Sequence, residues 1–431
     1  MAMLMHNRFN LVIAGLLAAT LLLGAAQPAA AQAEPEPELE RREPGVMMGE
    51  RAFRRFDNLT ELYTEGKYQE ALTAVQNYLA GTNLNDYERA MGEQIYGFTL
   101  IALDRVDEAV PRFERAIELN ALSNRAHFDM MKSLAQLYAS REQWQKSIDM
   151  MTEYLRYQPT PTPEDSIMMG QNYAQMERYR EALPWIRRAI ENAKDGKPPE
   201  SWYQLELAIH FELQDFRAGL RVLNKLVARW PQRLRYWETM AGAHQELNED
   251  VDALAALMTA YDAGLIQEQP KILSLVRTSM YVELPFQAGQ ILSQSMDQGI
   301  VEANESNLRL LLQAWTSARE YDRAGRVIDR LAPMTGDGDL FMQKARLMME
   351  QNEWQQTIDA ARQALELGNV SNPGGAWLMI GIAAMELDQL RESRQAFQQA
   401  QEFDANVRRQ AREWQRFVDE RIQVAELRRG Q

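Results

Sequence analysis

One spacing pattern that recurs along the chain limits what it can fold into more than any other feature. In each copy a small residue is usually followed four residues later by a bulky one, and three residues after that by a small or apolar one. On a helix these three side chains lie on one face. The copies begin at Ala71, Ala109, Ser147, Ala182, Gly219, Ala253, Gly289, Ala324, Thr357 and Ser393, between 33 and 38 residues apart. Such a chain has to stack its copies, because one copy alone cannot bury its apolar faces.

The last copy shows the expected unit most clearly, within Gly375–Asp404. Two helical patterns are joined there by a polar turn at Asp388-Gln389, which predicts a helix hairpin. Gly381 in the first helix and Ala400 in the second are both small. We expect the two backbones to approach each other most closely at these two residues.

The composition favours a fold made entirely of helices. Hydrophobic residues make up 46% of the chain and charged residues 25%, and good helix formers such as Leu, Ala, Glu, Gln and Arg dominate. We predict an all-α fold, an α-solenoid (superhelix) of about ten helix hairpins over residues 51–403, with a C-terminal capping helix within residues 404–431. The apolar face of that last helix is marked by Val407, Ala411, Trp414, Val418 and Ile422.

Four local predictions refine this array. Pro159–Pro163 is a rigid break, either a boundary between two halves of the solenoid or, as we favour, a stiff loop between repeats. The helix pattern around Trp202 fits only if one residue is inserted near Asp215. Asp86 is expected to cap the start of one helix, and Gly368 the end of another.

The repeated pattern resembles the tetratricopeptide repeat (TPR), whose period is about 34 residues and whose first helix reads W-x₂-L-G-x₂-Y. The clearest matches are Trp377/Ile380/Gly381, Trp237/Met240/Ala241, Met131/Leu134/Ala135/Tyr138 and Met169/Gly170/Tyr173, with Pro159 and Pro231 at the proline that ends a repeat. The resemblance recurs in register over nearly the whole chain after residue 50. It implies hairpins whose first helices line a concave groove.

The first residues have the layout of a secretory signal peptide, which we assign to residues 1–31. Arg8 precedes an apolar run, Leu11–Ala26, and small residues follow in two A-x-A sites. The alternative is a membrane anchor, but the run of 16 residues is shorter than the roughly 20 needed to span a bilayer. The chain has no Cys, so it has no site for lipid attachment to an N-terminal cysteine and no disulfide. We therefore predict a protein released into a bacterial periplasm without stable membrane insertion.

Residues 32–50 are predicted to form a disordered acidic leader, because alternating Glu and Pro in Glu34–Gly45 cannot form a helix or a core. An arm that binds a partner is the alternative reading of this segment. Removal of Arg8 with the signal changes the formal charge from −14 to −15. Such an acidic chain is not expected to bind nucleic acid or to be attracted to anionic lipid.

The sequence offers little that would support catalysis. No serine nucleophile motif, phosphate-binding glycine loop or H-E-x-x-H metal motif is present. His210 and His244 are 34 residues apart and would occupy equivalent places in adjacent repeats, where a shared metal is the alternative to a core or groove-wall role. His127 and the many methionines are interpreted as core residues. We expect no catalytic residue, no cofactor and no metal, and hence a protein that is not an enzyme.

The resemblance to the repeat family indicates which side chains face the groove. They are Phe98, Ile101, Lys132, Gln136, Ile167, Gln171, Glu238, Gln245, Arg309, Gln313, Met342, Arg346, Leu378 and Ile382. Long amides and apolar patches suit an extended peptide, since the amides bond its backbone and the patches take its side chains. The alternative for any one of them is a solvent-exposed position without a role. Repeats that clamp a terminal carboxylate place Asn where Gln136, Gln171 and Gln313 stand, so that binding mode is not expected.

Several segments outside the repeat pattern resemble the periplasmic TPR proteins associated with TonB–ExbB–ExbD energy-transduction systems of Gram-negative bacteria. They are Asn85–Ala90, Pro161–Gln171, Ser201–Tyr203, Tyr236-Trp237, Tyr261–Leu265, Gly299–Val301 and Asn372–Gly374. The resemblance implies an accessory role in TonB-dependent uptake across the outer membrane, with components of that system as partners.

Two other functions remain open at this stage. One is a scaffold for envelope assembly, secretion or polysaccharide export. The other is a repeat-bearing hydrolase or ligand sensor, which an enclosed pocket with clustered titratable groups would favour.

Overall fold

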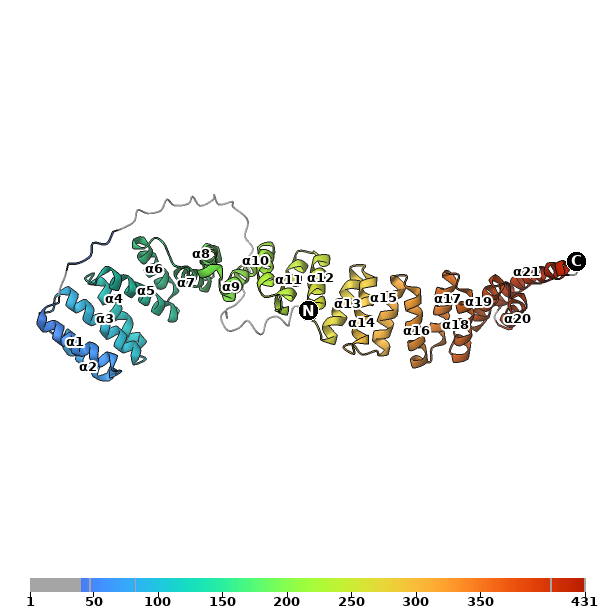
Figure 1. The fold of residues 1–431 in the computed structure, drawn as a ribbon, viewed down its shortest axis with the longest axis horizontal. Helices are drawn as coiled ribbons and strands as arrows, with labels where there is room; N and C mark the ends of the chain where they lie inside the picture. Colours follow the sequence, from blue (N-terminus) through green and yellow to red (C-terminus); the bar gives the residue numbers. More distant parts are fainter. Residues whose placement is uncertain (1–39, 46–47, 82, 404, 430–431) are drawn as a thin grey trace. The chain divides into compact units, whose positions relative to one another are not determined.

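A computed structural model describes residues 40–45, 48–81, 83–403 and 405–429 of the chain. Within these ranges all regular structure is helical (Figure 1). It comprises 21 α-helices and one short 3₁₀ helix. The all-α prediction is therefore confirmed. The predicted signal peptide, residues 1–31, and the start of the leader lie outside the described residues. None of the helices in the described part of the chain combines the length and the apolar character needed to cross a bilayer.

The helices form ten hairpins followed by one long helix. The first helices are α1 (Glu50–Thr64), α3 (Asp86–Ala102), α5 (Asn124–Ser140), α7 (Pro163–Gln175), α9 (Glu200–Glu212), α11 (Leu234–Glu246), α13 (Gln269–Tyr281), α15 (Glu305–Ser317), α17 (Gly338–Glu350) and α19 (Pro373–Glu386). The second helices are α2 (Tyr68–Leu79), α4 (Val106–Glu118), α6 (Trp144–Tyr157), α8 (Tyr179–Glu191), α10 (Phe216–Arg229), α12 (Asp250–Asp262), α14 (Pro285–Asp297), α16 (Tyr321–Thr335), α18 (Trp354–Leu367) and α20 (Leu390–Ala400). The last helix is α21 (Ala405–Arg429), and the 3₁₀ helix η1 covers Lys194–Gly196.

Every hairpin closes through the same three-residue turn. Its middle residue has a positive φ, between 54° at Gln214 and 76° at Gly66. The next N–H donates to the carbonyl five residues back at 2.8–2.9 Å, as from Arg105 to Leu100. This is the Schellman motif, which satisfies carbonyl groups at the end of a helix. The ten middle residues are Gly66, Asp104, Glu142, Glu177, Gln214, Asn248, Glu283, Arg319, Asn352 and Asp388.

Counting from this turn residue corrects two of the sequence-based predictions. The turn before α10 also has three residues, so no residue is inserted near Asp215. The copy assigned to Gly289 is one residue out of step, because the residue five places after the turn residue Glu283 is Ala288. Gly289 is small for a different reason: a Cβ there would lie 2.7 Å from the ring of Trp315 in the next hairpin.

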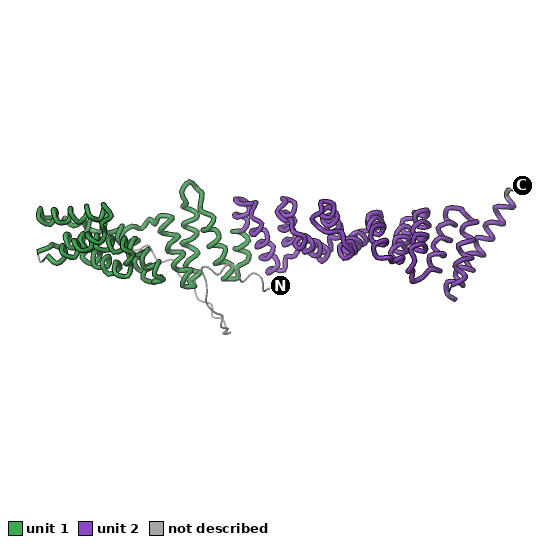
Figure 2. The backbone as a smooth tube through the Cα atoms, turned by 90° about the horizontal axis from the view of Figure 1, so that it is seen from below, with its two compact units in different colours: residues 1–222 green, residues 223–431 purple. Residues whose placement is uncertain are grey.

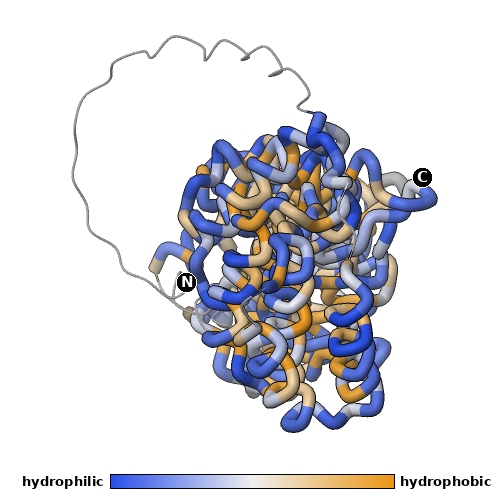
Figure 3. Tube along the Cα trace, turned by 90° about the vertical axis from the view of Figure 1, so that its left-hand side faces the viewer, coloured by the Kyte–Doolittle hydropathy of each residue, from blue (hydrophilic) through white to orange (hydrophobic). Residues whose placement is uncertain are grey.

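Size complementarity holds the two helices of a hairpin together. A Cβ placed on Gly97 or Gly381 would lie 2.5 Å from the ring of Phe113 or Phe397, and both rings are fully buried. Gly381 thus permits the predicted close approach, but its partner is Phe397, whereas Ala400 is buried elsewhere in the same hairpin. Hydrophobic and hydrophilic residues are interspersed along the trace (Figure 3), as expected where each helix buries one face.

The chain divides into two compact units, which we describe separately: unit 1 covers residues 1–222 and unit 2 covers residues 223–431 (Figure 2). In unit 1 the second helix of each hairpin packs on the first helix of the next, from α2 on α3 to α8 on α9. Unit 2 repeats this arrangement from α12 on α13 to α18 on α19. Each unit is thus a stack of helix hairpins of the TPR-like solenoid type.

The Pro-rich segment and the helix ends follow local chemistry. Pro159–Thr162 is a loop between repeats and not the unit boundary, with Thr162 as the N-cap of α7. Pro163, the last residue of the predicted break, is the first residue of α7. The cap of α3 is Asn85, not Asp86, because Asn85 and Glu88 form a reciprocal capping box. Gly368 ends α18 with φ 80°, as predicted.

Helix α21 covers the last hairpin, as the capping prediction required. Val407, Ala411 and Val418 are buried in a cluster with Phe397, and the ring of Trp414 stacks on that of Phe397 with centroids 6.4 Å apart. Trp414 keeps 38% of its surface exposed. The helix therefore supplies the apolar cover that the end of a repeat stack needs.

The leader differs from its prediction where the structure describes it. The guanidinium of Arg41 donates to the side chains of Asn120 and Asn124 and to the carbonyl of Leu122 at 2.6–3.0 Å. The side chain of Asn124 donates back to the carbonyl of Arg41 at 3.1 Å. These hydrogen bonds hold the segment around Arg41 against the start of α5 rather than leaving it in solvent.

We predict that Gly381→Ala destabilises the protein although alanine is the better helix former. The new methyl group would overlap the buried Phe397 ring, at an overpacking cost of about 1–3 kcal/mol. Gly242→Ala is the matched control, because no atom lies within 4 Å of a Cβ there, and it should stabilise by up to about 1 kcal/mol. Urea unfolding followed by circular dichroism measures both, and equal stability of the two variants would contradict the packing described.

Candidate functional site: the first-helix faces

Most of the predicted groove residues occupy two equivalent positions on the first helices. These positions lie six and ten residues before the turn residue, as Gln136 and Lys132 do relative to Glu142. Because they are four residues apart, they share one side of the helix. Twelve of the fourteen residues fit, and the other two, Ile101 and Gln245, lie three residues before the turn. We call these positions in each unit its first-helix face.

Exposure divides the predicted residues into three groups. The exposed ones are Gln136, Gln171, Gln245, Arg309, Gln313 and Arg346, and the half-buried ones are Phe98, Ile101, Lys132, Glu238 and Ile382. Ile167, Met342 and Leu378 are buried, with 8%, 2% and 8% of their surfaces exposed. These three residues contribute to the core and offer almost no surface to a partner. A binding role for the others stays a prediction.

One ion pair on each face links the first helices of successive hairpins. In unit 1 the Nζ of Lys132 on α5 lies 2.9 Å from an Asp165 oxygen on α7, and in unit 2 the Nζ of Lys271 on α13 lies 3.0 Å from a Glu238 oxygen on α11. Lys132 and Glu238 both lie ten residues before the turn residue of their hairpin, and their partners lie twelve residues before theirs. The two pairs thus occupy equivalent positions, with the acid and the lysine exchanged. Each pair thus joins two neighbouring first helices.

The unit 1 pair is the more buried of the two. Asp165 is buried and also completes the capping box of α7 with Thr162. Burial lowers the pKa of Lys132, but hydrogen bonds to Asp165 and Tyr154 outweigh it, so the pKa is raised overall. In the unit 2 pair, the hydrogen bond to Glu238 raises the pKa of Lys271. Both lysines are therefore charged at neutral pH.

Unit 1 also carries aromatic side chains that the sequence analysis did not single out. The ring of Phe128 on α5 lies 6.1 Å from that of Tyr154 and 5.7 Å from that of Tyr157. Phe128 is four residues before Lys132, which is the only sequence signal that places it on the same side of the helix. Helix α5 thus carries both an exposed amide, Gln136, and a half-buried aromatic ring, Phe128.

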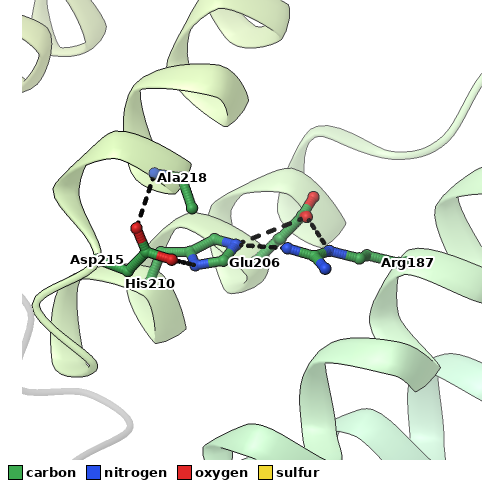
Figure 4. A network of polar contacts seen from close by, with 5 residues as sticks. All are labelled: Arg187, Glu206, His210, Asp215 and Ala218. Atoms are coloured by element: carbon green, nitrogen blue, oxygen red, sulfur yellow. Dashed lines mark hydrogen bonds and ion pairs between the residues drawn. The ribbon is translucent and has the colours of Figure 1, made fainter.

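His210 belongs to a polar network inside unit 1 (Figure 4). Arg187 on α8 donates to a Glu206 oxygen at 2.9 Å and contacts Nε2 of His210 at 3.0 Å, and Glu206 and His210 are both buried on α9. Since arginine only donates, Nε2 of His210 is the acceptor. Asp215 lies 3.8 Å from Nδ1 and accepts from the N–H of Ala218. The network ties α8 to α9 and to the start of α10.

His244 occupies the equivalent place in unit 2, with Nδ1 2.9 Å from the Glu249 carboxylate. His244, Glu249 and Asp252 are the one group in the described part of the chain whose ligand atoms have metal-like spacing, within 4.8 Å of one another. Glu249 and Asp252 are the N-cap and a first-turn residue of α12, where carboxylates are favoured by the helix dipole. The structure thus explains the group without an ion, and the contacts of each histidine described here lie within its own unit.

His127 is a buried core residue, as interpreted from the sequence. Burial, with a smaller contribution from the Arg41 charge, lowers its pKa to about 4. Its Nδ1 has no hydrogen-bond partner among the described residues. The imidazole is therefore neutral at physiological pH.

Comparison with known proteins supports the repeat assignment. Residues 374–407 match the model of the tetratricopeptide repeat family. That hairpin is therefore similar to a tetratricopeptide repeat. The other nine hairpins share its three-residue turn, so the array as a whole is TPR-like. A comparison with curated proteins found no match.

Several solved structures are similar to the chain, at low identity. A tetratricopeptide repeat protein from Parabacteroides merdae shares 13% identity over 62% of this chain and 99% of its own, with a TM-score of 0.35. YrrB, described as a TPR protein with an unusual peptide-binding site, shares 15% identity over 44% of this chain and 91% of its own, with a TM-score of 0.34. Naa15/Naa10 bound to HypK-THB matches at 13% identity over 85% of this chain and 66% of its own, with a TM-score of 0.40.

We predict that Lys132→Ala destabilises the protein by roughly 1–3 kcal/mol, because it leaves the buried Asp165 carboxylate without its charged partner. Arg309→Ala is the control, since the Arg309–Glu305 pair is about half exposed and should contribute less than about 1 kcal/mol. Chemical unfolding of the two variants gives the comparison. Equal losses in the free energy of unfolding would show that burial does not make the Lys132 pair more stabilising than the exposed Arg309 pair.

The low pKa of His127 predicts a loss of stability in mild acid. Its folded-state pKa, about 4, lies below the ordinary value of 6.5, so protonation favours the unfolded chain. The contribution is present above pH 6.5 and is lost as the pH falls toward 4. Between pH 7.5 and 5, the melting temperature of the wild type should therefore fall further than that of His127→Gln. Parallel curves for the two proteins would show that His127 titrates normally.

Proposed function

We propose that the protein is a non-enzymatic scaffold that binds an extended peptide or protein segment along its first-helix faces. The observation that carries this proposal is the exposed amide at the same position of successive first helices, Gln136 on α5 and Gln171 on α7. Gln136 and Gln171 lie on neighbouring first helices, which the Lys132–Asp165 ion pair joins. A peptide crossing these two helices would therefore meet one amide on each.

The chemistry of these side chains suits a peptide backbone. A glutamine amide both donates and accepts, as a peptide group does, and it carries no charge that would restrict the sequence it binds. Phe98, whose ring lies 5.1 Å from that of Phe113, adds half-buried apolar surface for side chains. The titratable clusters described above support a scaffold rather than an enzyme, because the His210 network and the Lys132 pair both join helices.

We further propose that this scaffold acts in a bacterial periplasm as an accessory of TonB-dependent energy transduction. The support is the signal-peptide pattern of residues 1–31 and the sequence segments that resemble TonB-associated TPR proteins. A scaffold for envelope assembly, secretion or polysaccharide export is the alternative, since the same signal and the same repeat would serve it.

The proposal predicts that the mature protein recovers TonB-system components from an envelope extract of its own bacterium. Replacing Gln136 and Gln171 with Ala should weaken capture roughly tenfold or more, because each lost hydrogen bond costs about 0.5–1.5 kcal/mol. Gln395→Ala/Gln399→Ala on α20 is the matched control, with two exposed glutamines four residues apart, and it should leave capture unchanged.

Quantitative mass spectrometry of the captured proteins tests the TonB role separately from the scaffold function. Consistent recovery of export or assembly machinery alone would refute the TonB role while leaving the scaffold intact. Capture that is insensitive to the Gln136/Gln171 variant would refute the first-helix face as the binding surface.

A further inference from the structure

A polar cleft lies in unit 2, away from the first-helix face. It has a volume of about 770 Å³ and is formed by the consecutive helices α14, α15 and α16 (Figure 1). Its lining residues come mainly from the two second helices, α14 and α16, and from α15 only through Leu311 and Trp315. Neither residue is among the predicted groove positions, so the cleft is a separate site.

One wall of the cleft is made of arginines. Arg323, Arg326 and Arg330 follow one another on α16 at spacings of three and four residues, which places them on one side of the helix. Arg323 lies over the Trp315 ring at 4.6 Å and pairs with Glu320 at 3.3 Å. Arg326 and Arg330 are exposed and make no hydrogen bond or ion pair with any described residue.

The opposite wall and the floor have a different character. Gln290 and Gln294 on α14 and Gln298, its C-cap, line this wall at four-residue spacing. The floor consists of buried apolar side chains, Leu311, Trp315 and Val327. Asp297 is the only acid in the lining, against three arginines. In a chain with a formal charge of −14, the cleft is thus a local site of positive charge.

We propose that this cleft binds an extended acidic peptide segment of a partner protein, with carboxylates at alternate residues. Four residues of α-helix rise about 6 Å, which separates Arg326 from Arg330 along α16. Alternate side chains of an extended chain point the same way and are about 6.6 Å apart. A Glu-X-Glu segment therefore presents one carboxylate to each guanidinium, which binds carboxylates through two parallel hydrogen bonds.

The other groups complete the recognition. The side chain between the two acids points away from the arginines, toward Gln290 and Gln294. Their amides donate to and accept from a polar side chain such as serine. The buried apolar floor lies beneath the segment. One extended acidic segment can therefore contact both the arginines and the glutamines of the cleft.

The leader of this chain is a poorer fit than a partner segment. Glu34, Glu36 and Glu38 also alternate, but Pro35 and Pro37 fix the backbone dihedral φ between them. In the polyproline helix that such a sequence favours, three residues make one turn, so alternate carboxylates point to different sides. Two neighbouring arginines on one helix face cannot pair with both.

Fluorescence anisotropy with labelled synthetic peptides tests the proposal on the full mature protein. The probe is a ten-residue peptide of alternating Ser and Glu, which should bind. Its affinity should fall as salt is raised from about 50 to about 300 mM, because the Debye length shortens and the charges are screened. Arg326→Ala/Arg330→Ala should weaken binding at least tenfold. Arg412→Ala/Arg416→Ala is the matched control, with two exposed arginines four residues apart on α21, and should change it less than threefold.

Several outcomes would overturn the proposal. No binding of the Ser-Glu peptide, equal binding of a Ser-Gln peptide, or equal losses in the two double variants would show that the cleft is not the site. Displacement by inorganic phosphate as effective as by unlabelled peptide would make it a small-anion site. A peptide with the sequence of residues 32–40 that binds as tightly as the probe would assign the cleft to the leader. Gln136→Ala/Gln171→Ala should not affect this assay, so its result is independent of the proposed first-helix function.

Discussion

The left-handed residue in each hairpin turn is the constraint on which the rest of the structure depends. It turns the chain back so that the second helix lies against the first, and nine of the ten residues that adopt it are not glycine. This conformation costs an L-residue roughly 1–2 kcal/mol. The paired hydrogen bonds of the Schellman motif and the packing of the two helices offset that cost. The turn is therefore a consequence of hairpin packing as much as of local sequence.

A fixed turn makes size complementarity the main rule for the core. Gly97 and Gly381 on first helices face phenylalanines of the same hairpin, and Gly170 at the equivalent position faces Ile186. On second helices, Gly289 faces Trp315 of the next hairpin, whereas Gly219 faces Phe211 of its own hairpin. Because volume is shared between neighbours, the individual repeats can differ in sequence while each hairpin keeps the same geometry.

Because core volume is shared between neighbouring repeats, only some features of the fold were predictable from the sequence. The period, the hairpins and the capping helix follow from patterns within one repeat, and the structure confirms them. The one-residue error at Gly289 arose because Trp315, in the next repeat, decides what is small there. The burial of Ile167, Met342 and Leu378 likewise depends on packing that a single-helix pattern does not contain. The docking of Arg41 involves residues some 80 positions away, which no local pattern indicates.

Positions that the core does not use are free to vary, and they differ along the chain. The equivalent ion pairs Lys132–Asp165 and Glu238–Lys271 keep the link between first helices but reverse its polarity. The first-helix position six residues before the turn is an exposed Gln at 136, 171 and 313 but Arg at 346. On the second helices, three arginines gather in one cleft. A single repeated framework thus presents chemically different surfaces in its two units, which is what a scaffold with more than one partner segment requires.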